Sequence, residues 1–251
     1  MDSTAKFSGK QADYAAARPS YAAAFLAHLA ALYPAGAAAA DIGSGTGKLT
    51  AQLLDAGFSV FAVEPNDDMR NEAERLLAGR AGFVSVAGRE RATGLPSGSV
   101  DFVTAAQAFH WFDAAAFRRE CLRILRPGGR VFLVWNNRVA DAPVNVETFR
   151  VFRAFCPGFR GASNGFDARA AAFDDFFGGP YERLEFPNPL TFSQDSFLRR
   201  AFSASYALPE THSAFPAYRQ ALYEVFDRFA ADGLLAVPNV TEVYAGVLRA
   251  D

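Results

Sequence analysis

The sequence has little cysteine, no excess of basic charge and no clean apolar run of membrane length. Its two cysteines, Cys121 and Cys156, lack the spacing of a metal site, and Cys121 reads as a reduced, buried thiol. Lys and Arg number 25 against 27 Asp and Glu, and no run of like charge builds a basic patch. These absences argue against a metal site and against binding to nucleic acid.

One uncharged stretch, residues 19–40, approaches the length of a membrane span. Polar or helix-breaking residues interrupt it at His28, Pro34 and Gly36. Its larger apolar side chains follow one helical stripe, which indicates an amphipathic helix and then a buried strand: Tyr21, Phe25, Leu26, Leu29 and Leu32. The residues before it are charged, unlike a signal peptide. We therefore expect a cytoplasmic protein with no membrane association.

From residue 37 onward, short apolar runs alternate with segments of helical period, which is typical of a parallel sheet covered by helices. Asn66 and Asp113 are good helix-capping residues and predict two of the helix starts. Another helix is expected at 46–56. The predicted strands are residues 37–42, 59–63, 82–86, 100–105 and 130–135.

Beyond residue 137 the periodicity weakens. Many of the 25 phenylalanines fall between Phe149 and Phe177, in a segment with no clean period that we interpret as a cap or lid. Core packing is the simplest role for most of them. The last third predicts these further elements: a strand at 181–186, helices at 193–204 and 212–231, and a strand at 240–248.

The sharpest motif is the glycine-rich segment 41–47, Asp-Ile-Gly-Ser-Gly-Thr-Gly, between the first strand and its helix. Glycines there allow a tight turn and close approach to a ligand, and the helix start offers free N–H groups. Glu64 ends the next strand, where a carboxylate can accept hydrogen bonds from adenosine ribose hydroxyls. The spacing lacks the last glycine of a dinucleotide fingerprint, where Lys48 stands, and no Walker motif is present.

The spacing Asp-x-Gly-x-Gly-x-Gly resembles the first motif of class I S-adenosylmethionine-dependent methyltransferases. Further segments resemble the trans-aconitate methyltransferase-like (methyltransferase type 11) subgroup: residues 7–10, 14–21, 106–112, 125–129 and 135–138. The resemblance implies an α/β fold with a Rossmann-like, seven-stranded, mostly parallel sheet whose last strand is antiparallel. Helices would cover both faces. The expected single domain, 1–251, comprises an amino-terminal lid at 1–35, a cofactor core at 36–138, an inserted helical substrate cap at 139–180 and the end of the sheet with flanking helices at 181–251.

The resemblance also implies a site for S-adenosylmethionine and its product S-adenosylhomocysteine. The acid before the glycines would help to hold the methionine end. Where relatives often place an acid after strand three, this chain reads Gly-Arg-Glu-Arg at 88–91, so Glu90 or the backbone would contact the adenine. The expected cofactor residues are Asp41, Gly43, Ser44, Gly45, Gly47, Glu64, Pro65, Met69, Arg89, Glu90, Ala106 and Gln107.

Methyl transfer from a sulfonium is an in-line displacement, in which the protein mainly aligns the reactants and excludes water. The end of strand four would face the methyl group, which makes Gln107, His110 and Arg18 the candidate catalytic residues. His110 has three interpretations: a general base, a group that orients a substrate oxygen, or a structural histidine. The candidate substrate-binding residues are Tyr14, Arg18, Tyr21, His110, Trp111 and Arg138.

The acceptor is expected to be a small molecule, methylated at a carboxylate or hydroxyl oxygen. A carboxylate is already ionised and needs no base, whereas a phenol would require one. After strand four the chain reads Gln-Ala-Phe-His at 107–110, unlike the Asn/Asp-Pro-Pro-aromatic motif of protein and DNA amino-methylating enzymes. Two alternatives stay open: a methyltransferase-fold binding protein without turnover, and a nicotinamide-dependent oxidoreductase.

Overall fold

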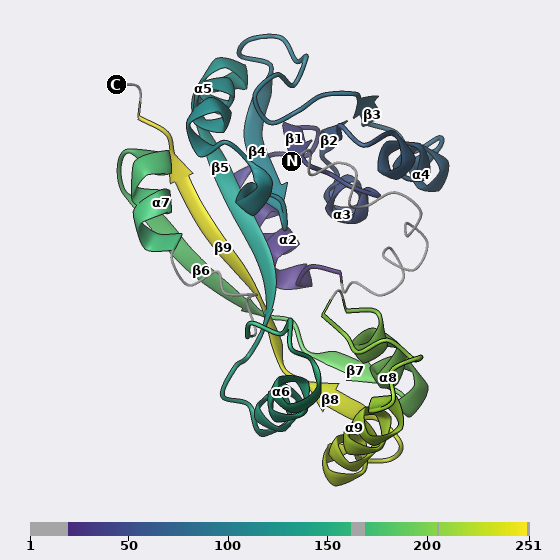
Figure 1. Cartoon of the computed structure of the whole chain (residues 1–251). Helices are drawn as coiled ribbons and strands as arrows, with labels where there is room; N and C mark the ends of the chain where they lie inside the picture. The colour runs from purple at the N-terminus through teal and green to yellow at the C-terminus, as the bar shows by residue number, and fades with distance from the viewer. Residues whose placement is uncertain (1–19, 162–168, 205, 250–251) are drawn as a thin grey trace.

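The computed structural model describes residues 20–161, 169–204 and 206–249 and contains a seven-stranded sheet of order β3-β2-β1-β4-β5-β9-β6 (Figure 1). The strands β1 to β5 pair in parallel, and β9 is antiparallel to both of its neighbours. This confirms the predicted mostly parallel sheet with an antiparallel last strand. The strands are β1 (Ala38–Ile42), β2 (Ser59–Val63), β3 (Phe83–Val86), β4 (Val100–Ala106), β5 (Leu125–Arg138), β6 (Tyr181–Pro187) and β9 (Asn239–Val247).

Helices cover both faces of this sheet. On one face, α2 and α3 pack their apolar stripes against side chains such as Phe102 and Phe132. On the other, α5 and α7 pack against side chains such as Leu133 and Trp135. Alternation along each strand sends successive side chains to opposite faces, so both cores are apolar. The helices are α2 (Ala23–Leu32), α3 (Lys48–Asp55), α4 (Asp67–Leu77), α5 (Ala114–Ile124) and α7 (Arg169–Phe177).

The two predicted helix caps are confirmed. The Asn66 side chain accepts a hydrogen bond from the Met69 amide at the start of α4, and Asp113 accepts one from Ala116 at the start of α5. A side-chain oxygen at this position satisfies an amide that the helix leaves unpaired. The α4 cap, Asn66, lies two residues after Glu64, so it also fixes the chain beside the glycine-rich segment.

A smaller layer lies beyond the ends of β5 and β9 (Figure 1) and has its own aromatic core. It contains α6 (Pro143–Phe155), β7 (Leu190–Phe192), α8 (Gln194–Phe202), α9 (Phe215–Phe229) and β8 (Leu235–Val237). The bounds of the predicted cap, 139–180, need correction, because α7 covers the sheet while α8 and α9 join α6; that this layer binds substrate stays a prediction. We call α6, α8, α9, β7 and β8 the cap layer.

The amino-terminal lid predicted at 1–35 also needs correction where the structure describes it. Residues 23–32 form α2, whose Phe25 and Leu29 are fully buried against the sheet, so this part belongs to the core. Leu32, predicted on the buried stripe, is 42% exposed because the helix ends there. Within the described residues, no helix is both long and apolar enough to cross a membrane.

Candidate functional site

The glycine-rich segment 41–47 forms a tight loop between β1 and α3, and its three glycines have positive φ angles. At Gly43 a Cβ atom would lie 2.8 Å from the Ala108 Cβ and 3.2 Å from the Phe112 ring. Gly43 therefore allows the loop after β4 to pack directly on the glycine-rich loop. The structure thus brings together two segments that the sequence predicted to form one site.

Glu64, at the end of β2, holds this loop from the side. One carboxylate oxygen accepts the Gly45 amide at 2.9 Å and the other accepts the Asn66 amide at 2.8 Å. The pKa of Glu64 is raised above its usual value, because the effect of burial outweighs the two amide hydrogen bonds and Arg70, which lower it. Each carboxylate oxygen can accept more than one hydrogen bond, so Glu64 can still accept hydrogen bonds from ribose hydroxyls.

Asp41 is 1% exposed, and its carboxylate contacts two threonine hydroxyls. Thr50 of α3 donates at 2.7 Å and Thr104 of β4 donates at 2.9 Å. Asp41 therefore ties the first strand to its helix and to the neighbouring strand. The sequence reasoning missed these partners, although parallel pairing of β1 with β4 places Thr104 in register with Asp41. Its predicted contact with the methionine end of the cofactor stays a prediction.

Gln107 follows β4 in a left-handed conformation, with a φ angle of 54°. Its backbone amide donates a hydrogen bond to the Val134 carbonyl at 2.8 Å, and its side-chain amide donates one to the Asn136 carbonyl at 3.2 Å. Such backbone conformations are costly for residues other than glycine and cluster at functional sites. Gln107 thus links the chain after β4 to the end of β5.

His110 and Trp111 lie in a short 3-10 helix, Phe109–Trp111, directly after Gln107. The His110 ring is half-buried and lies 4.9 Å from the Trp111 ring, which is 46% exposed. Both side chains therefore belong to the segment after β4 that packs against Gly43 of the glycine-rich loop. The three interpretations of His110 remain open.

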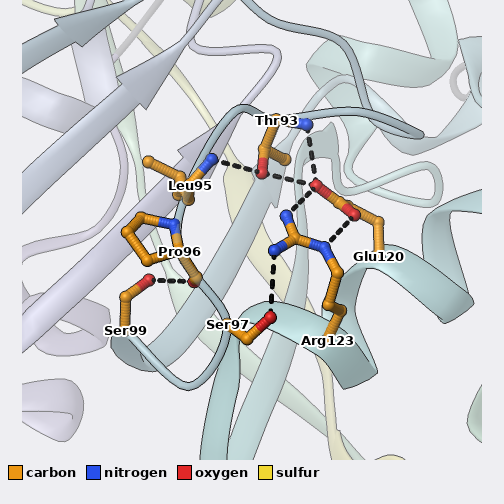
Figure 2. Close-up of polar contacts among 7 residues, drawn as sticks. All are labelled: Thr93, Leu95, Pro96, Ser97, Ser99, Glu120 and Arg123. Atoms are coloured by element: carbon orange, nitrogen blue, oxygen red, sulfur yellow. Dashed lines mark hydrogen bonds and ion pairs between the residues drawn. The ribbon is translucent and has the colours of Figure 1, made fainter.

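The chain after β3 is fixed by a polar cluster that the sequence reasoning missed (Figure 2). Glu120 of α5 accepts the Thr93 amide at 2.7 Å, the Thr93 hydroxyl at 2.6 Å and a two-point contact from Arg123. Arg123 first, and then Thr93, lowers the pKa of Glu120 to about 2. The only sequence signal was the Glu-x-x-Arg spacing on one face of α5, since the partner Thr93 lies 27 residues away.

Gly88 starts the same segment, and its backbone lies close to Thr93 at the other end of that segment. A Cβ atom there would lie 2.6 Å from the Thr93 carbonyl oxygen and 2.9 Å from a Val63 methyl. The next residues form a narrow turn, in which the Arg89 and Ala92 amides exchange hydrogen bonds with each other's carbonyls. The departure at 88–91 is therefore an ordered turn, with Arg89 exposed and Glu90 half-buried.

The remaining predicted residues divide by position. Tyr14 and Arg18 lie outside the described residues. Tyr21 is buried and exchanges two backbone hydrogen bonds of 2.8 Å with the Gln52 side chain of α3. Arg138 ends β5 and contacts the cap layer. Beside the loop, Met69 is buried, Pro65 is half-buried and Ala106 ends β4.

This sheet order, together with the glycine-rich loop and the acid at the end of β2, defines a Rossmann-like domain of the class I methyltransferase type. The sequence comparisons agree with it. A methyltransferase domain family matches residues 40–133. A methyltransferase-like protein of Schizosaccharomyces pombe is 31% identical over 216 residues, covering 79% of this chain and 78% of the relative. The chain therefore belongs to the class I S-adenosylmethionine-dependent methyltransferases, and S-adenosylmethionine is its cofactor.

Other relatives extend the likeness over part of the chain or over the fold alone. A methyltransferase of Mycobacterium tuberculosis is 39% identical over 137 residues, and the chain spans 54% of the length of that relative. A putative type II methyltransferase of Anaeromyxobacter dehalogenans has a similar structure, with a TM-score of 0.63 and 24% identity, covering 92% of this chain and 99% of that one. That structural likeness concerns the fold.

The residues of the glycine-rich loop fit a nucleoside cofactor. The Ser44 hydroxyl is buried and has no hydrogen-bond partner among the described residues, so it is available to a ligand. A Cβ atom at Gly45 would meet only the Met69 sulfur, at 3.8 Å, within 4 Å, which leaves space beside the Gly45 backbone. Ser44, Gly45 and Glu64 would hold the cofactor.

Proposed function

We propose that this chain catalyses methyl transfer to an oxygen atom, carboxylate or hydroxyl, of a small molecule. The observation that carries the proposal is the contact of Gly43 with Ala108 and Phe112, which sets the loop for the cofactor beside the segment that carries His110. Bound S-adenosylmethionine supplies an electrophilic methyl group on its sulfonium. The protein has to align the acceptor with that group and exclude water.

The chain's own residues suit this task. Gln107 is held in a strained conformation by two hydrogen bonds to the end of β5, which gives the acceptor site a fixed wall. His110, three residues on, orients the acceptor oxygen, and accepts a proton where the acceptor is a hydroxyl. Both cysteines are buried free thiols, which suits the cytoplasmic location we propose.

The first test is calorimetric titration with S-adenosylhomocysteine. We expect micromolar binding to the wild-type protein and weaker binding to Glu64→Ala. Ser44→Ala sharpens the test, because it removes a hydroxyl with no partner in the described protein and should leave thermal stability unchanged. We expect it to weaken binding about 3- to 10-fold, the value of one hydrogen bond. Ser203→Ala, directly after α8 of the cap layer, is the matched control and should bind normally.

A turnover assay then separates the activities. Carboxylic acids and phenols are incubated with S-adenosylmethionine, and release of S-adenosylhomocysteine is measured. Cofactor binding without methylation of any acceptor would instead support a binding protein without turnover. Binding of NAD in place of S-adenosylhomocysteine would support the oxidoreductase alternative.

A further inference from the structure

Arg138 has an unusual environment for a charged side chain. Its guanidinium lies over two phenyl rings of α6, 5.7 Å from the Phe149 centroid and 5.5 Å from the Phe152 centroid. Its Nη1 atom is buried and has no hydrogen-bond partner among the described residues, and no carboxylate of those residues forms an ion pair with it. Tyr206 and Tyr218 are close enough to act on its charge, and both are tyrosines and not carboxylates.

Other arginines of the described chain are placed differently. Arg123, Arg126 and Arg183, for example, each pair with a carboxylate at 2.7 Å and are 40%, 47% and 57% exposed. Burial lowers the pKa of the Arg138 guanidinium, yet an arginine keeps its charge in a protein. Phenyl faces compensate only part of the cost of removing such a charge from water. An apolar residue would be expected to stabilise this position better, so the charge indicates a ligand.

The position of Arg138 connects it to the proposed methyl-transfer site. Asn136, whose carbonyl accepts the Gln107 side chain, precedes Arg138 by two residues in β5. Residues two apart in a strand share a face and lie about 7 Å apart. Arg138 thus lies one step beyond the Gln107 contact, where the strand reaches the cap layer. The residue as a whole is half-buried, although its Nη1 atom is buried.

We propose that Arg138 binds the carboxylate of the methyl acceptor, and that this acceptor is an organic monocarboxylate with an apolar or aromatic body. The inference rests on the proposed function, because it concerns the acceptor of that reaction. A guanidinium binds a carboxylate through two parallel hydrogen bonds. One unpaired cation matches one negative charge, which favours a carboxylate over a phosphate. The Phe149 and Phe152 rings suit an apolar body beside the charge.

The test uses the full chain saturated with S-adenosylhomocysteine and calorimetric titration with matched pairs of probes. The pairs are benzoate and benzamide, 3-phenylpropionate and 3-phenylpropionamide, and hexanoate and hexanamide, which differ in charge and little in shape. We expect at least one carboxylate to bind the wild-type protein about tenfold or more tightly than its amide, the value of a charge-assisted hydrogen bond.

Four variants assign that preference to Arg138. Arg138→Met and Arg138→Gln should lose it, while Arg138→Lys should keep part of it, because lysine retains the charge without the fork. Arg150→Met, which removes an exposed arginine from the same α6 helix, should keep it in full. S-adenosylhomocysteine should bind all four variants as it binds the wild type, which also reports that each is folded. If Arg138→Met fails this check, Arg138→Gln takes its place.

The inference is overturned if the wild type shows no carboxylate preference in any pair, or if a folded neutral variant keeps it. Failure of the proposed function gives a different result. In that case S-adenosylhomocysteine does not bind, or it binds and the turnover assay shows no methylation of any acceptor, whereas the carboxylate preference and its loss in Arg138→Gln persist.

Discussion

Replacing Asp41 with asparagine should stabilise the protein at neutral pH. The Asp41 carboxyl is almost fully buried, and burial, outweighing hydrogen bonds from Thr50 and Thr104, raises its pKa from 3.8 to about 6. A carboxylate ionised at pH 7 is therefore held in an environment that favours its neutral form. Asparagine has the same shape and no charge, and its amide can still exchange hydrogen bonds with both hydroxyls.

The magnitude follows from linkage. Because the folded state binds the proton more tightly than the unfolded state, the stability from this group is full below pH 3.8 and is lost as pH rises through about 6. At 1.36 kcal/mol per pKa unit, the loss amounts to roughly 3 kcal/mol at pH 7. Asp41→Asn should recover a part of it, about 1–3 kcal/mol, and should flatten the dependence of stability on pH between 4 and 7.

Urea unfolding followed by circular dichroism, at pH values from 4 to 7.5, measures both effects. Asp101→Asn is the matched control on the neighbouring strand. Hydrogen bonds from Arg126 and Ala38 outweigh burial and lower the pKa of Asp101, so its variant should be less stable at pH 7. A clear loss of stability in Asp41→Asn at pH 7, or an unchanged pH dependence, would refute the reasoning.

Two further predictions concern the segment after β3. Glu120→Gln should cost about 1–3 kcal/mol at pH 7, because it removes the charge that pairs with Arg123 and sets an amide N–H against the Arg123 Nε–H. Urea unfolding should show this difference shrinking as pH falls below 4.5 toward about 2, where the wild-type carboxylate is protonated. Gly88→Ala should cost about 1–3 kcal/mol through overpacking against Thr93 and Val63, and should weaken S-adenosylhomocysteine binding in calorimetry. Gly98→Ala, where a Cβ meets no atom within 4 Å, should leave that binding unchanged, and equal binding by both variants would contradict the account.

The first half of the fold was predictable because its signals are local. Strand β2 was predicted at its observed bounds, and β1, β3 and β4 to within one residue, since each is a short apolar run between turn residues. Strand β5 was predicted too short. Its first residue, Leu125, already pairs with Val100 of β4 before the Pro-Gly-Gly turn, and its last residues pair with β9. Pairing across 100 residues leaves no local pattern.

The segment 139–180 was predicted poorly for a related reason. Helices α6 and α7 belong to different cores, with Phe152 buried in the cap layer and Phe176 buried against the sheet. Both helices are rich in phenylalanine, so hydrophobicity alone does not tell which core each joins. Which core a helix joins depends on its tertiary contacts. Phenylalanine side chains can be buried equally well in either core, so the composition of the helix does not decide.

Within the candidate site, the sequence identified the loops and missed what holds them. The glycine spacing and Glu64 were visible as motifs, since ligand-binding loops carry residues that packing does not require. The carboxylate contacts to Gly45, Thr104 and Thr93 were not, because each partner comes from another element. Buried carboxylates thus act here as ties between segments, and their partners follow only from the tertiary arrangement of the elements.

The length of β5 explains how the two halves of the site are kept in place. Its pairing with β4 ends at Val134, where Ala106 is the last partner, but the strand continues to Arg138 paired with β9. The β6 strand pairs with β9 as far as Val240, so this overhang is part of a three-stranded ribbon and not a free loop. Asn136 and Arg138 therefore take their positions from the same sheet that positions the cofactor loop. The cap layer contributes Phe149 and Phe152 from a separate core. Changes in α6 would then alter the shape of the proposed acceptor site, while the charge at Arg138 and the geometry around Gln107 stay fixed.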